Sequence, residues 1–109
     1  MIIEAKEDTL YLSGSFYENH WPTLEGAVRY LLRNRPKGII VECSRMNLAA
    51  EAGVRTFLEV LRNAAAQNWR VLFVNLPEEA RARIRTTPGL RSQLPIANSV
   101  EEARQSLEI

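Results

Sequence analysis

Two uninterrupted apolar runs of strand length constrain the fold of this chain more than any other feature. They read GIIVEC at 38–43 and RVLFVNL at 70–76. Short runs of this kind, rich in β-branched residues, are typical of strands that are covered on both faces of a parallel sheet. Between the two runs, apolar residues recur at the spacing of one helix face, at Val54, Phe57, Leu58 and Leu61. The sequence therefore predicts a strand–helix–strand unit with parallel strands and a right-handed crossover.

The remaining segments extend this unit on both sides. Strands are predicted at 1–6, 9–15 and 94–97, and helices at 77–87 and 99–109. A further helix has Pro22 in its first turn and is ended by Asn34, Pro36 and Gly38. The last helix opens with a capping box formed by Ser99 and Glu102. The predicted core consists of Leu10, Leu12, Val28, Leu31, Ile39, Ile40, Val41, Val54, Phe57, Leu61, Val71, Phe73, Val74, Val100 and Leu107.

Strands that alternate with helices indicate one α/β domain over residues 1–109. The first two strands form a hairpin, so the sheet is small, mixed and mainly parallel. We expect about four or five strands, flanked by about four helices.

The composition excludes several classes of function. One histidine, His20, and one cysteine, Cys43, leave no disulfide, no zinc site of several cysteines and no credible catalytic triad. There is no glycine-rich phosphate loop. A net charge of +1 gives no basis for binding nucleic acid, and no apolar run approaches the ~20 residues that span a membrane. We therefore expect a cytoplasmic, non-catalytic protein without metal or cofactor.

Several segments, taken in order, resemble one known family. They are LYLSGSF at 10–16, NHWPTLEGAVRYLL at 19–32, GIIVECSRMNLAAEAGVRTFLEVLRNA at 38–64, RVLFVNLPEEARARI at 70–84 and VEEA at 100–103. Their order and spacing are similar to those of the STAS domain, the module shared by sulphate transporters and anti-sigma factor antagonists. The resemblance covers nearly the whole chain and implies a small mixed sheet flanked by helices.

The resemblance also implies a function and a surface. Members that act as anti-sigma factor antagonists bind an anti-sigma factor with kinase activity, and phosphorylation at the start of the second helix breaks that complex. The family motif D-S-S-G falls on Ala50, Glu51, Ala52 and Gly53, so Glu51 occupies the phosphoacceptor position. A carboxylate carries one charge, whereas a phosphate carries nearly two. The implied partner-binding residues are Met46, Asn47, Leu48, Ala50, Glu51 and Arg55.

Glu51 is open to two interpretations. As a structural residue, it is an acid stabilised by the helix dipole and able to pair with Arg55 one turn later. As a functional residue, it permanently imitates part of a phosphoserine. A displaced phosphoacceptor is a further alternative, at Ser44, which we expect at a buried strand end where a kinase has little access.

Three functions follow from these observations. The first is a regulatory module that resembles an anti-sigma factor antagonist, binds an anti-sigma factor, a serine kinase-like protein or another regulatory protein, and lacks the usual serine switch. The second is a STAS subunit of a membrane transport assembly, docked permanently through the same helix face with Trp21 and Trp69 exposed. The third is a small-ligand binder or an enzyme built on the same α/β fold, which would need a pocket with convergent polar groups.

Overall fold

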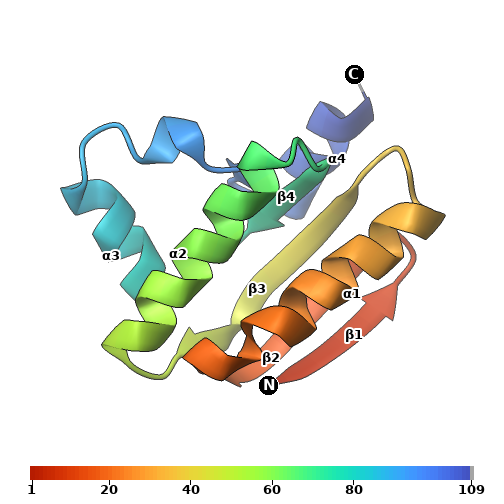
Figure 1. Cartoon of the computed structure of the whole chain (residues 1–109). Coiled ribbons are helices and arrows are strands. Elements are labelled where there is room, and N and C mark those ends of the chain that lie inside the picture. Colours follow the sequence, from red (N-terminus) through yellow and green to blue (C-terminus); the bar gives the residue numbers. More distant parts are fainter. Residues whose placement is uncertain (109) are drawn as a thin grey trace.

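A computed structural model describes residues 1–108 and contains one five-stranded mixed sheet in the order β1-β2-β3-β4-β5 (Figure 1). The strands are β1 (Ile2–Lys6), β2 (Thr9–Phe16), β3 (Ile39–Leu48), β4 (Val71–Val74) and β5 (Ile96–Ala97). The helices are α1 (Trp21–Asn34), α2 (Glu51–Ala66), α3 (Glu78–Thr86) and α4 (Val100–Glu108), with 3-10 turns η1 (Glu18–His20) and η2 (Arg91–Gln93). Strand β1 is antiparallel to β2, and every other neighbouring pair is parallel. The predicted α/β fold class is confirmed.

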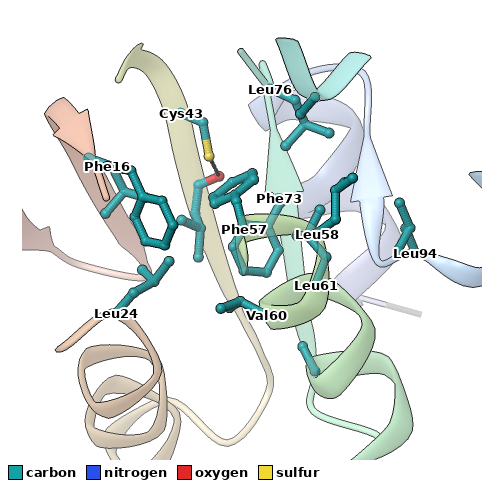
Figure 2. Packing of buried hydrophobic residues seen from close by; sticks show 14 of the residues in the cluster. Phe16, Leu24, Cys43, Phe57, Leu58, Val60, Leu61, Phe73, Leu76 and Leu94 are labelled. Atoms are coloured by element: carbon teal, nitrogen blue, oxygen red, sulfur yellow. Dashed lines mark hydrogen bonds between the residues drawn. The ribbon is translucent and has the colours of Figure 1, made fainter. Parts of the chain in front are cut away.

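Helices cover the two faces of the sheet unequally. Helices α1 and α2 lie side by side across one face, whereas α4 lies behind the sheet (Figure 1). The larger core fills the α1–α2 side, and Figure 2 shows Phe57 of α2 near its centre. The ring of Phe57 meets Phe16 and Phe73 edge to face, with centroids 5.5 and 6.1 Å apart. These three rings fix α2 against the middle of the sheet.

The predicted core is confirmed except at two positions. Val100 and Leu107 are only half-buried, and both belong to α4. This helix packs on a thin second cluster formed by Ile40, Val74 and Ala103. This cluster is too small to cover the whole apolar face of a nine-residue helix, so Val100 and Leu107 remain partly in contact with solvent.

Strand β3 is longer than predicted. We expected it to end at Cys43, but it continues to Leu48 because β2 offers backbone partners as far as Phe16. A bulge lies on the way, where Tyr11 pairs with Glu42 and the next paired residue of β2, Ser13, pairs with Arg45. Only Ala49 and Ala50 therefore separate β3 from α2, and the helix follows the strand almost directly.

The remaining differences concern helix ends and one tryptophan. The serine half of the predicted capping box is present, because the Glu102 N–H donates to Ser99 Oγ at 3.1 Å. The predicted C-terminal helix residue Ile109 lies outside the described residues. Trp69, which only the hypothesis of a docked transport subunit required to be exposed, is half-buried against the larger core.

Candidate functional site

The carboxyl ends of β2 and β3 meet at one edge of the sheet, and each leads into a helix. Gly53, in the first turn of α2, explains how closely these parts approach: a Cβ at this position would lie 2.9 Å from the carbonyl oxygen of Phe16. The same oxygen accepts the Ala49 N–H at 3.1 Å, so it is fixed by the sheet. Only glycine allows α2 to begin directly against the end of β2.

Glu51 is the first residue of α2, and its carboxylate contacts another helix. The preceding residue, Ala50, is extended and has no side chain that can cap the helix. The Glu51 carboxylate instead accepts from the guanidinium of Arg83 on α3 and forms an ion pair with it. The pair with Arg55 that the helical spacing allowed is not among the ion pairs of residues 1–108.

The structure divides the predicted partner-binding residues into two groups. Asn47, Ala50, Glu51 and Arg55 are exposed, and their use by a partner stays a prediction. Met46 and Leu48 are only 5% and 6% exposed and belong to the larger core. Their assignment to the surface was wrong, because β3 extends through both and its alternation turns them toward the helices.

Two large aromatic side chains lie beside the start of α2, and only one of them, Trp21, was predicted from the sequence to be exposed. Tyr17 and Trp21 are 52% and 45% exposed, although both are large and mainly apolar. The chain between them is held by His20, whose Nδ1 accepts the Tyr17 N–H at 3.0 Å while its ring meets Phe16 edge to face. Pro22 in the first turn of α1 was the available signal, because it places Trp21 at a helix start.

A groove of about 920 Å³ runs between the start of α1, the outer face of α2, and α3. Trp21 lines one side, Arg83 lines the other, and Arg55 projects from α2 between them. Its charged residues are three arginines and two glutamates, namely Arg55, Arg62, Arg83, Glu18 and Glu59. Arg62 and Glu59 pair with each other at 2.8 Å. Arg55 forms no ion pair with any of the described residues.

A second polar group lies at the end of β4. The Glu42 carboxylate accepts the Ser44 N–H at 2.6 Å and also accepts from the Asn75 side chain. Partial burial alone would raise the pKa of Glu42, but these hydrogen bonds outweigh it and hold the pKa below its ordinary value. Ser44 is exposed, because β4 has ended beside it, so our expectation of a buried strand end was wrong.

Cys43 has the environment of a packing residue. It is fully buried, and its thiol donates to the Val41 carbonyl oxygen at 3.7 Å, as drawn in Figure 2. Burial raises the pKa of this thiol far above its ordinary range. A neutral, enclosed thiol is a poor nucleophile and a poor metal ligand.

Two further properties concern only the described part of the chain. Within residues 1–108, no three His, Cys, Asp or Glu side chains gather as a metal ion would require. No helix in that range combines the length and apolar character needed to cross a membrane.

Solved structures with the same fold include regulatory proteins. An anti-sigma factor antagonist from Mycobacterium paratuberculosis superimposes with a TM-score of 0.65 at 16% identity, covering 99% of this chain and 92% of that one. A protein of the stressosome, described as a signal integration and transduction hub, gives 0.59 at 14% identity, covering 98% and 96%. A serine-to-glutamate variant of RsbS from Moorella thermoacetica gives 0.54 at 18% identity, covering 97% and 95%. At such low identity, the superpositions establish a shared fold and no more.

Sequence comparison identifies the family. No curated protein matches the chain. A family model described as "Mlab, STAS domain" matches residues 3–88, which run from the second residue of β1 past the end of α3 and include the whole edge around the start of α2. The resemblance in sequence and the agreement in fold therefore converge, and the chain belongs to the STAS domain family.

Proposed function

We propose that this chain is a non-catalytic interaction module that binds a regulatory protein through the edge where β2 and β3 end. The observation that carries the proposal is the pair of exposed rings, Tyr17 and Trp21, beside the start of α2. Rigid aromatic side chains at the surface are the residues most often found at binding hot spots. The expected partner is a cytoplasmic anti-sigma factor or serine kinase-like protein, by analogy with the anti-sigma factor antagonist and stressosome proteins that share the fold.

The proposed module acts without a serine switch at the start of α2. Residues 50–53 read AEAG and contain no hydroxyl group that a kinase could modify. Glu51 is already charged, and it is engaged by Arg83 within the same chain. Binding would therefore be controlled by the abundance of the partners or by changes on the partner, instead of by phosphorylation at this position.

The experiment compares two aromatic residues on the same helix. Trp21 lies at the start of α1 beside the proposed surface, whereas Tyr30 lies more than two turns further along and is 66% exposed. We expect Trp21→Ala to weaken binding of a kinase-type anti-sigma factor at least about tenfold, the effect of losing a hot-spot side chain. Tyr30→Ala should leave the affinity unchanged. Equal effects of the two variants, measured by isothermal titration, would show that this edge is not the binding surface.

A second candidate is a subunit of a membrane transport assembly. The observation that favours it is the pairing of Glu51 with Arg83, because a carboxylate already paired inside the chain costs less to bury in a permanent interface than an unpaired one. Purification of the chain from detergent-solubilised membranes distinguishes the two candidate functions. Recovery of a transport ATPase or permease in stoichiometric amount with wild-type protein, and its absence with Trp21→Ala, would support a role in a transport assembly in place of the regulatory role.

A further inference from the structure

Arg83 behaves differently from the other arginines of α3. Arg81 and Arg85 both pair with Glu78 of their own helix, at 3.0 and 2.7 Å. Their side chains are 57% and 62% exposed, whereas that of Arg83 is 35% exposed. The side chain of Arg83 pairs with no residue of its own helix and instead contacts Glu51, 32 residues away in the sequence. This long-range contact is the only ion pair between α2 and α3 among the described residues.

The two helix ends favour this ion pair. Glu51 opens α2, where the helix dipole stabilises a negative charge. Arg83 lies in the last turn of α3, where the dipole stabilises a positive charge. The guanidinium also forms part of the groove wall, whereas the carboxylate that it engages does not line the groove. Arg83 therefore masks the charge of Glu51 by pairing with it from the groove wall, although the Glu51 side chain itself remains 63% exposed.

We propose that Arg83 is a positioning and specificity-determining residue that masks the Glu51 carboxylate and so sets the charge of the partner-binding edge. With Glu51 masked and Glu59 paired to Arg62, Arg55 is the unpaired charge that α2 presents in the groove. Glu18, the other unpaired groove charge, belongs to η1. The partner that fits carries a carboxylate beside an apolar side chain, for Arg55 and for Trp21 respectively. The choice of partner rests on the proposed function, whereas the masking itself does not.

The masking is tested on the isolated full-length chain by a double-mutant cycle. Glu51→Gln, Arg83→Gln and the double variant are unfolded with urea at low salt. We expect a coupling of roughly 1.5-fold to 5-fold in the folding equilibrium constant, the range for a partly exposed ion pair. The coupling should shrink at 1 M salt, where charges are screened within a few ångströms. The matched cycle of Glu51→Gln with Arg85→Gln should show none. Absence of coupling in the Arg83 cycle, or equal coupling in both cycles, would overturn the proposal.

The consequence for binding is tested with the anti-sigma factor used above. Arg83→Gln uncovers a negative charge, and Glu51→Gln releases a positive one, so the two variants should change the affinity in opposite directions. A unit charge about 7 Å from an acidic group of the partner changes the affinity roughly threefold in water. We expect weaker binding for Arg83→Gln and tighter binding for Glu51→Gln. Changes in the same direction would overturn the inferred acidic partner. If wild-type protein shows no binding, the proposed function fails, while the urea cycle still decides the masking.

Discussion

Replacing Gly53 with alanine isolates the contact that places the start of α2 against the end of β2. The added Cβ would lie 2.9 Å from the carbonyl oxygen of Phe16, a distance that real Cβ atoms essentially never show. That oxygen also accepts the Ala49 N–H, so it has little freedom to retreat. Overpacking of a well-packed site costs about 1–3 kcal/mol, whereas alanine exceeds glycine in helix propensity by at most about 1 kcal/mol. We therefore expect Gly53→Ala to destabilise the fold by about 1–2 kcal/mol.

The matched control is Gly26 in the middle of α1. A Cβ at Gly26 would have no atom of another part of the chain within 4 Å, so Gly26→Ala gains helix propensity without strain. This variant should be more stable than wild type by about 0.5–1 kcal/mol. Urea unfolding followed by circular dichroism measures both. The close approach of α2 to β2 would be refuted if Gly53→Ala were stabilising to the same extent as Gly26→Ala.

Three further experiments test individual contacts. The Arg104 hydrogen bond lowers the pKa of Asp8, so stability gained from this pair is present above the unfolded pKa and is lost as the pH falls through the folded one. The stability difference between wild type and Asp8→Asn should therefore shrink below about pH 4, and a constant difference from pH 7 to 3 would contradict the pairing. Cys43 should resist a thiol reagent in native buffer and react in urea, and rapid native labelling would show that its burial is wrong. Ser99→Ala should lower stability by ~1 kcal/mol in thermal unfolding, and no change would remove its role as a cap.

The sequence predicted those parts of the fold that depend on local patterns. The apolar runs at 38–43 and 70–76 are read correctly because a buried parallel strand needs apolar residues on both faces. The helix stripe of α2 is equally legible, since Phe57 and its neighbours must face one core. Both patterns lie within short windows of sequence, so they can be recognised without knowing which other segments of the chain pack against them.

Features that depend on pairing between distant segments were not predicted. The end of β3 is set by the length of β2 and by a bulge that lies between the pairs Tyr11–Glu42 and Ser13–Arg45. Neither feature can be recognised from residues 43–48 alone. Because β3 was predicted to end too early, Met46 and Leu48 were assigned to the surface although they belong to the core. For the same reason Ser44 was expected to be buried although it is exposed. The partner of Glu51 was missed because it also lies in a distant segment. Helical spacing suggested Arg55, whereas the contact with Arg83 exists only because α3 packs beside α2.

Binding of a regulatory protein at the start of α2 is tested most directly by mapping the contact surface by NMR. Uniformly ¹⁵N-labelled chain is titrated with an unlabelled kinase-type anti-sigma factor, and amide shifts are followed. We expect the largest changes at residues 17–21 and 47–55 and at Arg83, which together form the edge and the groove wall. The opposite end of the molecule, around residues 35–38 and Arg70, should remain unchanged. Changes concentrated at that opposite end, or on strand β1, with residues 47–55 unaffected, would contradict the proposed binding surface.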